Sequence, residues 1–139
     1  MFLTYRVNAP ITREQFEGIL YASGLAERRP VHDAARLQRM LDHANLTLTA
    51  WDGERLVGIV RVWNDGGFLA YIADLAVHPD YQGHGIGREL LRRVTSADPE
   101  IIYLLHAAPT AMEFYRHTGW RAMSNAWVWP RERMGTRDE

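Results

Sequence analysis

Three glycines stand at alternate positions in the segment QGHGIG, residues 82–87, and an amphipathic helix pattern follows at once. The first amides of a helix have no partner inside the helix and carry the positive end of its dipole, so they can bind an anion. Glycine lets the backbone approach a phosphate closely and adopt φ angles that other residues resist. The spacing therefore indicates a phosphate-binding loop, and a plain tight turn between a strand and a helix is the alternative.

Two familiar phosphate loops do not fit this segment. A Walker loop needs a lysine, and all 16 basic residues of the chain are arginine. A dinucleotide-binding fingerprint needs the spacing G-x-G-x-x-G, whereas Gly83, Gly85 and Gly87 have the spacing G-x-G-x-G. The segment does match the pattern Gln/Arg-x-x-Gly-x-Gly/Ala, which starts at Gln82. Since no lysine is present, the backbone amides and the helix dipole would have to supply the positive field.

Local patterns predict the elements that must hold this loop in place. Thr12 and Gln15 form a capping-box pattern that opens a helix, and Asp33 can cap a second helix. Farther along, an Asp-Gly turn joins two alternating strands into a hairpin. The elements expected before the loop are strand 4–8, helix 12–23, a helix from 33 to about 43, strands 46–51 and 56–63, and the buried strand 68–77.

After the loop, helix and strand patterns alternate. The elements expected there are helix 85–96, strand 101–107, helix 110–117 and closing strand segments at 120–123 and 126–129. A meander followed by a β-α-β-α passage is typical of an α/β domain with a mixed sheet and helices on its faces. At 139 residues, 47% of them hydrophobic, the chain has the size and apolar content of one domain over residues 1–139.

Composition excludes several classes of protein. The chain has no cysteine, which excludes a disulfide scaffold and thiolate metal sites. Its formal net charge is −1, so no overall positive field would attract nucleic acid. No signal-peptide pattern opens the chain, and no apolar run approaches the roughly 20 residues that cross a bilayer. We therefore expect a cytoplasmic protein that needs no metal and binds neither nucleic acid nor membrane.

The loop and the segments around it resemble the GNAT superfamily of N-acetyltransferases. Upstream, IADLAVHPDYQG, residues 72–83, is similar to the central strand of the family and the corner after it. Downstream, AMEFYRHTGWRAM, residues 111–123, is similar to the last family motif. The order of the expected elements agrees over nearly the whole chain. The resemblance implies a mixed, mostly antiparallel sheet flanked by helices on both faces, acetyltransferase activity, and acetyl-CoA as cosubstrate.

The resemblance also implies how the backbone would bind coenzyme A. Its pyrophosphate would lie on the amides of the loop residues, which are Gln82, Gly83, His84, Gly85, Ile86, Gly87 and Arg88. In this family the central strand separates from its neighbour beside a bulge and leaves backbone groups for the pantetheine arm; Leu75, Ala76 and Val77 match those positions. The amide of Val77 would contact the thioester carbonyl. The three side chains themselves are simply core residues, and the His84 side chain either contacts phosphate or is an exposed loop histidine.

Three side chains are candidates for proton transfer. Tyr115 matches the family tyrosine whose phenol protonates or stabilises the departing thiolate, and packing on the sheet is the alternative. The acceptor amine must lose a proton before it attacks. Asp74 on the central strand and His106 after YLL could each act as the base, or serve as a structural hydrogen-bond acceptor and a strand-end cap. Ala108 stands where many members carry an asparagine that contacts pantetheine, so that contact is absent or replaced.

The expected reaction is direct transfer of an acetyl group from acetyl-CoA to a primary amine of a small molecule, in a ternary complex. A catalytically silent module that binds coenzyme A is one alternative, and an enzyme acting on a protein or RNA is another. Arg28 and Arg29 could line the acceptor cleft or belong to a solvated surface. Trp127 and Trp129, on the terminal strands, would suit a homodimer contact.

Overall fold

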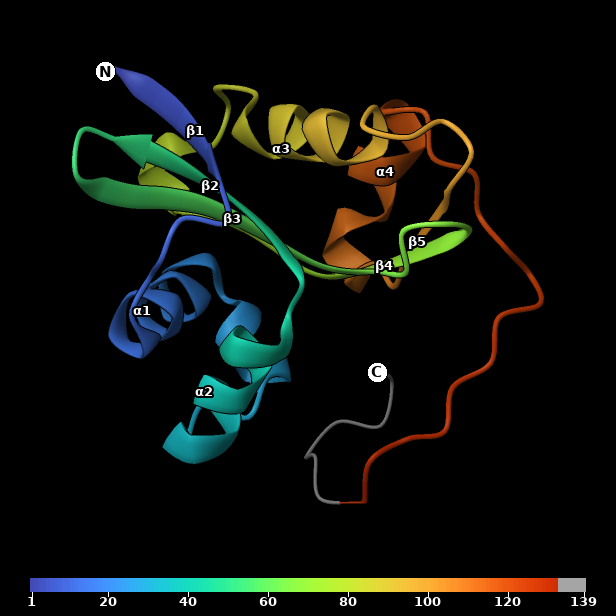
Figure 1. Cartoon of the computed structure of the whole chain (residues 1–139), viewed down its shortest axis with the longest axis horizontal. Helices are drawn as coiled ribbons and strands as arrows, with labels where there is room; N and C mark the ends of the chain where they lie inside the picture. Colours follow the sequence, from blue (N-terminus) through green and yellow to red (C-terminus); the bar gives the residue numbers. More distant parts are fainter. Residues whose placement is uncertain (133–139) are drawn as a thin grey trace.

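The computed structural model describes residues 1–132 and shows one five-stranded sheet between two layers of helices (Figure 1). The strand order is β1-β2-β3-β4-β5, with antiparallel pairs up to β4 and a parallel pair between β4 and β5. This confirms the expected α/β class with a mixed, mostly antiparallel sheet. The elements are β1 Leu3–Val7, α1 Arg13–Ser23, η1 Leu25–Arg28, α2 Ala34–His43, β2 Leu46–Asp52, β3 Arg55–Asn64, β4 Leu69–Val77, η2 Pro79–Tyr81, α3 Ile86–Thr95, β5 Ile102–Leu105, η3 Pro109–Ala111 and α4 Met112–His117.

The two N-terminal helices begin where their capping residues predict. The Thr12 hydroxyl accepts a hydrogen bond from the Gln15 amide at 3.0 Å, and the Gln15 side chain accepts one from the Thr12 amide at 2.9 Å. The Asp33 carboxylate accepts a hydrogen bond from the Arg36 amide at 3.1 Å at the start of α2. These bonds satisfy amides that have no partner within their own helix. Local sequence signals alone therefore locate both helix starts.

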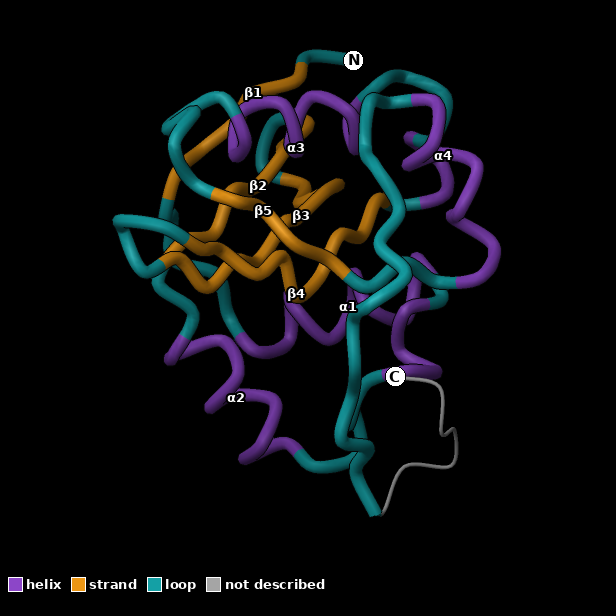
Figure 2. Tube along the Cα trace, turned by 90° about the vertical axis from the view of Figure 1, so that its right-hand side faces the viewer, coloured by secondary structure: helices purple, strands orange, loops and turns teal. Residues whose placement is uncertain are grey.

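Helices cover both faces of the sheet, α1 and α2 on one face and α3 and α4 on the other (Figures 1 and 2). The buried core is divided accordingly. One cluster contains Ile86 and Leu90 of α3 together with Val60 of β3. The other contains Phe16 of α1 together with Ile59 of β3. Neighbouring residues of β3 thus face opposite helical layers, as the alternation of side chains along a strand requires.

A bulge interrupts β4. Asp74 lies opposite Arg61 of β3, whereas Ile72 lies opposite the very next residue of β3, so Ala73 has no partner across this pair. An extra residue of this kind shifts the alternation of the side chains that follow it. Ile72 accordingly belongs to the buried cluster under α3, whereas Ala76 belongs to the cluster under α1 and α2.

Strands β4 and β5 pair only along the first part of β4. Their parallel register runs from Leu69 opposite Ile102 to Ile72 opposite Leu105, where β5 ends. In the described part of the chain, residues 73–77 of β4 are therefore bordered by β3 alone. The two strands diverge from the bulge onward.

Helix α3 lies close against β3 at Gly58. A Cβ atom at this position would be 2.9 Å from Cγ2 of Ile86 and 3.3 Å from Cδ1 of Leu90. Only glycine leaves enough room for the helix at this distance from the strand. The first turns of α3 are thereby held over β3 and beside the end of β4.

The closing strands expected at 120–123 and 126–129 do not form in the described structure. Both segments are rich in apolar residues, but no described strand pairs with them, and such a segment gains stability as a strand only with a partner. Trp127 and Trp129 are each 94% exposed. Residues 133–139 of the expected domain 1–139 lie outside the described residues, and the extent of the domain stays a prediction. None of the helices within residues 1–132 is long and apolar enough to span a bilayer.

Candidate active site

Three segments that are distant in sequence meet at Gly87, in the first turn of α3. A Cβ atom built on Gly87 would lie 3.6 Å from Cγ2 of Val77, 3.7 Å from Cζ of Phe114 and 3.8 Å from Cδ2 of Leu75. The glycine-rich loop, the end of β4 and α4 therefore converge beside the part of β4 that β5 does not reach. These are the segments on which the family resemblance rests, and they form one site.

Two left-handed residues shape the loop. The φ angle is +84° at Gly83 and +77° at Gly85, a conformation that costs other residues roughly 1–2 kcal/mol. Gly85 is the N-cap of α3 and has no side chain that could satisfy the first amides of the helix. Gly87 lies inside α3 without a positive φ. The first amides of α3 are thus available to an outside acceptor, as an anion site requires.

The corner before the loop is tied to the hairpin of β2 and β3. The Tyr81 hydroxyl donates a hydrogen bond to Oδ2 of Asp52 at 2.5 Å, which raises the pKa of Tyr81 and lowers the pKa of Asp52. The Arg55 guanidinium lies 5.3 Å from the centroid of the Tyr81 ring. Nδ1 of His78 accepts a hydrogen bond from the Asp80 amide at 3.1 Å. Sequence patterns did not predict the Tyr81 anchor, because its partner is 29 residues away.

The backbone of β4 alternates between groups that bond to β3 and groups that point away from it. The His78 amide donates to the Val57 carbonyl at 2.8 Å. In an antiparallel ladder every second residue occupies such a bonded position, and the unbroken register places Ala76 in the next one. The backbone groups of Leu75 and Val77 therefore point to the side that β5 leaves open. We call these outward-facing backbone groups of Leu75 and Val77 the strand slot.

Tyr115 lies on α4 between two aromatic rings. Its ring centroid is 5.1 Å from that of Phe114 and 5.9 Å from that of Trp120, both in edge-on geometry. Burial raises the pKa of the Tyr115 hydroxyl, so the phenol keeps its proton at neutral pH. Within residues 1–132 the hydroxyl has no hydrogen-bond partner. A neutral phenol fits the predicted role as an acid, and its packing against the core also fits the alternative.

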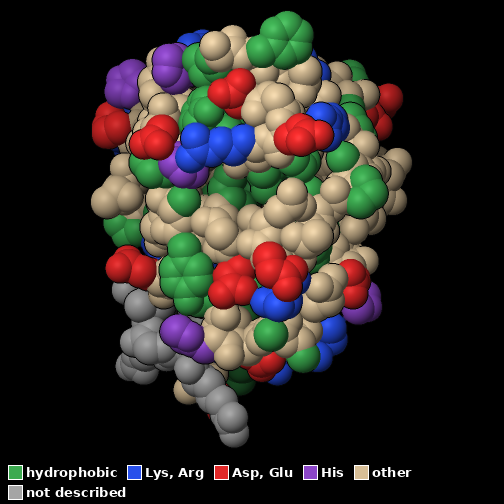
Figure 3. Space-filling view, turned by 90° about the vertical axis from the view of Figure 1, so that its left-hand side faces the viewer, with side chains coloured by type: hydrophobic (Ala, Val, Ile, Leu, Met, Phe, Trp, Pro, Cys, Tyr) green, Lys and Arg blue, Asp and Glu red, His purple; other side chains and the backbone are tan. Residues whose placement is uncertain are grey.

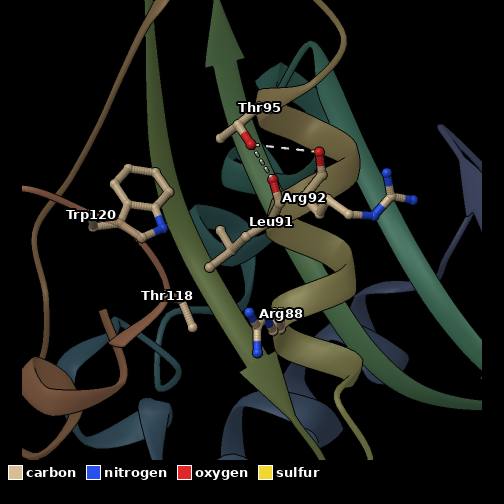
Figure 4. A pocket seen from close by; sticks show the side chains of 6 residues that line it. All are labelled: Arg88, Leu91, Arg92, Thr95, Thr118 and Trp120. Atoms are coloured by element: carbon tan, nitrogen blue, oxygen red, sulfur yellow. Dashed lines mark hydrogen bonds between the residues drawn. The ribbon is translucent and has the colours of Figure 1, made fainter. Parts of the chain in front are cut away.

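A hollow of about 270 Å³ lies between α3 and the segment after α4 (Figure 4). Its lining consists of Arg88, Leu91, Arg92, Thr95, Thr118 and Trp120. Glu89 binds the Arg92 guanidinium at 2.9 Å and 2.6 Å, whereas Arg88 has no ion pair with another described residue. A guanidinium and an indole ring beside one hollow suit a phosphate-bearing aromatic ligand. The sequence patterns predicted only Arg88 here, because Trp120 was expected in a strand.

Asp74, one of the two candidate bases, is fully buried and doubly ion-paired. Its Oδ1 lies 2.6 Å from Nε of Arg29, and its Oδ2 lies 2.5 Å from Nε of Arg61. These contacts favour the structural alternative for Asp74, and its role as a base stays a prediction that they do not support. Arg29, expected on the acceptor cleft or on a solvated surface, instead binds Asp74 from the connection between α1 and α2.

His106 and His84 are both exposed. His106 follows β5 directly, next to the region where β4 and β5 diverge, and His84 lies in the glycine-rich loop. Their roles as a base and as a phosphate contact stay predictions. Ala108 is the N-cap of η3 and makes no side-chain cap, and the absence or replacement of the asparagine contact stays a prediction. Residues 1–132 contain no group of three His, Asp or Glu side chains that could hold a metal ion.

The face formed by the β2–β3 hairpin end and α1 carries both signs of charge (Figure 3). Acidic and basic side chains alternate on it and form no large surface of a single sign. A polyanion such as RNA would need a broad basic face, and this side of the molecule does not offer one.

Comparisons with known proteins agree with this geometry. The model of the acetyltransferase (GNAT) domain family matches residues 11–128. The uncharacterized N-acetyltransferase ycf52-like protein of Prochlorococcus marinus is 34% identical over 114 residues, which cover 76% of this chain and 61% of that protein. The chain thus spans less than two thirds of the length of this relative.

Two solved structures show the same fold at low sequence identity. The SA2161 protein of meticillin-resistant Staphylococcus aureus has a TM-score of 0.77 and 22% identity, with 94% of this chain and 99% of that chain covered. An aminoglycoside acetyltransferase from an uncultured soil metagenomic sample has a TM-score of 0.69 and 22% identity, with 94% and 95% covered. With the family model matching most of the chain, and the loop, the diverging strand and the tyrosine helix in one place, this protein belongs to the GNAT acetyltransferase family.

Proposed function

We propose that this acetyltransferase moves an acetyl group directly from acetyl-CoA to a primary amine of a small molecule, with both substrates bound at once. The convergence at Gly87 carries the proposal. A Cβ atom built on Gly87, in the first turn of α3, would lie within 4 Å of side chains of Leu75 and Val77, which carry the strand slot, and of Phe114 on α4, which also carries Tyr115. A diphosphate, an amide-rich arm and a thioester can be bound in sequence along such a site.

In this proposal the backbone does most of the cofactor binding. The amides from Gln82 to Arg88 bind the pyrophosphate, and the outward-facing groups of Leu75 and Val77 pair with the pantetheine arm. Ala76 contributes less than its neighbours, because its backbone groups are directed toward β3. The hollow beside Arg88 and Trp120 suits the nucleotide end of coenzyme A.

The thioester end of acetyl-CoA would lie at the C-terminal end of β4. Acetyl-CoA supplies an activated thioester, and the Val77 amide would donate a hydrogen bond to its carbonyl oxygen, where negative charge develops during attack. The amine nitrogen bonds to the carbonyl carbon as the carbon–sulfur bond breaks. Tyr115 gives its proton to the departing sulfur, and the amine proton passes to His106 or to water.

A small acceptor is favoured by the mixed charge of the hairpin face, which lacks a single-sign groove for a long polymer. The soil metagenomic enzyme that shares this fold is an aminoglycoside acetyltransferase, so the architecture accommodates small polyamines in at least one protein. Two alternatives remain open: a module that binds coenzyme A without catalysis, and an enzyme acting on a protein or RNA amine.

Calorimetric titration with acetyl-CoA and free coenzyme A, followed by thiol release with a panel of small amines, tests the proposal. Micromolar binding with amine-dependent thiol release supports it and begins to define the acceptor. Binding without release from any small amine contradicts the small-molecule transferase. Absence of binding contradicts the assignment of the loop.

The exposed pair Trp127 and Trp129 supports a further proposal, that two copies of the chain associate through their C-terminal segments. Light scattering after size exclusion tests it. A dimer that becomes a monomer in the double variant W127S/W129S supports this contact, and a monomeric wild-type protein contradicts it. A cytoplasmic location stays a prediction.

A further inference from the structure

We infer that Arg29 is a positioning residue that holds the β4 bulge in the shape required by the strand slot. The inference rests on the proposed function, because the slot matters only if it receives the acetyl-CoA arm. Arg29 directly follows η1, in the connection between α1 and α2, and therefore lies in the helical layer opposite the glycine-rich loop. It would control the reactive end of the site from the far side of the sheet.

Arg29 supplies the hydrogen bond that the bulge lacks. Its Nη2 donates to the Ala73 carbonyl at 2.8 Å, while its Nε donates to Oδ1 of Asp74 at 2.6 Å. Ala73 has no partner across the pair with β3, and the pairing with β5 stops one residue earlier. Ala73 is half-buried, and a backbone carbonyl that is shielded from water and lacks a donor is destabilising. One guanidinium therefore binds the backbone and the side chain of two consecutive residues at the point where the strands diverge.

Asp74 makes this contact rigid. Its side chain is fully buried, and the Arg61 guanidinium binds the second carboxylate oxygen at 2.5 Å. Arg61 also donates to the Met40 carbonyl in α2 at 3.3 Å. Two guanidinium groups from different elements thus fix the orientation of the residue that directly precedes Leu75. The β3 ladder that directs the Leu75 and Val77 backbone outward resumes at Asp74, so the position of Asp74 sets where the strand slot begins.

Arginine is required because the contact needs a fork of donors. Lysine carries the same charge but only a compact ammonium group, which cannot bind a carboxylate and a neighbouring carbonyl in the same planar geometry. Arg29→Ala leaves Asp74 paired with Arg61, so the buried carboxylate keeps one partner while the Ala73 carbonyl loses its donor. Arg39, exposed on α2, offers a matched control that removes the same charge without touching the bulge.

Isotope-edited infrared spectroscopy of bound acetyl-CoA, labelled with ¹³C at the thioester carbonyl, measures the hydrogen bonding of that carbonyl in the strand slot. The measurement needs no acceptor amine. In the wild type and in Arg39→Ala, a hydrogen bond from the strand should shift the carbonyl band to lower frequency than in solution. In Arg29→Ala the band should return toward its solution position, and Arg29→Lys should fall between. Free coenzyme A affinity should stay within about threefold, and turnover should fall at least about tenfold, since one such donor contributes about 10²–10³ in rate.

Two results would overturn the role of Arg29. One is a carbonyl band and a turnover in Arg29→Ala that match the wild type. The other is a parallel loss of melting temperature and coenzyme A affinity in Arg29→Ala, with the carbonyl band of bound acetyl-CoA at the same frequency as in the wild type. That result would make Arg29 a merely structural residue. Absence of acetyl-CoA binding by the wild type is a separate outcome, and it contradicts the proposed function.

Discussion

Separate alanine replacements of Gly85 and Gly87 test whether the loop binds the cofactor through the direction of its backbone. At Gly85, φ is +77° and nothing lies within 4 Å of a built Cβ, so alanine introduces strain without a clash. The strain is about 1–2 kcal/mol. At Gly87, φ is not positive and the nearest atom is 3.6 Å from the Cβ, an ordinary contact. Alanine there should stabilise α3 by about 0.5–1 kcal/mol.

Melting and binding should then change in different ways. In a chain of 139 residues, 1 kcal/mol corresponds to about 3 °C in melting temperature. Gly85→Ala should lower the melting temperature by about 3–6 °C, and Gly87→Ala should raise it by about 1.5–3 °C. Because strain at Gly85 turns the first amides of α3, Gly85→Ala should also weaken acetyl-CoA binding at least about tenfold, or 1.4 kcal/mol, whereas Gly87→Ala should keep it within threefold. Calorimetry well below the melting temperature measures both affinities; an equal loss in the two variants, or full affinity in Gly85→Ala, refutes the reasoning.

Three further changes separate chemistry, packing and charge. Tyr115→Phe should lower turnover about tenfold or more while coenzyme A affinity changes only a few-fold, and unchanged thiol-release rates would remove Tyr115 from the mechanism. Gly58→Ala should destabilise the fold by about 1–3 kcal/mol, because its Cβ would lie 2.9 Å from Cγ2 of Ile86; urea midpoints should show no such loss in Gly18→Ala, where nothing lies within 4 Å. Two arginines of α3 lower the pKa of Glu89 from 4.5 to about 2, so its carboxylate stabilises the fold above pH 4.5 and loses this effect as the pH falls toward 2. Glu89→Gln should therefore be less stable by about 0.5–1 kcal/mol at pH 7, with no difference near pH 2.

Local chemistry predicted most of the fold. Both N-terminal helices start at their capping residues, Thr12 and Asp33, and the hairpin forms around an Asp-Gly turn, because each of these signals acts within a few residues. The loop conformation was equally local, since Gly83 and Gly85 have the positive φ angles that only glycine adopts readily. The candidate segments could therefore be identified before their meeting point was known.

Features that depend on partners distant in sequence escaped prediction. The apolar segment 126–129 is typical of a buried strand, but composition alone does not supply a neighbouring strand to pair with. The family resemblance predicted a bulge beside Leu75 and Val77, but the local pattern did not mark its position, because the run 68–77 is apolar apart from Asp74 and shows no regular alternation to interrupt. The sequence shows that residue 74 is an aspartate, but an aspartate can act as a base or as a structural ion-pair partner. Only the two guanidinium groups beside Asp74 distinguish these roles.

The proposed mechanism divides cofactor binding and reactivity between the two helical layers. The amides proposed to bind phosphate lie in the first turn of α3 on one face of the sheet, while Arg29 and Arg61, which we infer hold the bulge beside the strand slot, bind Asp74 on the other face. The bonds of Arg29 and Arg61 to Asp74 lie on the opposite face from the α3 turn, which approaches β4 at Gly87, so each part can be altered without direct contact with the other. Changes in the loop should therefore appear mainly in cofactor affinity, and changes around the bulge mainly in turnover. A loop variant that changed turnover at saturating acetyl-CoA as strongly as a bulge variant would mean that the sheet transmits strain between the layers.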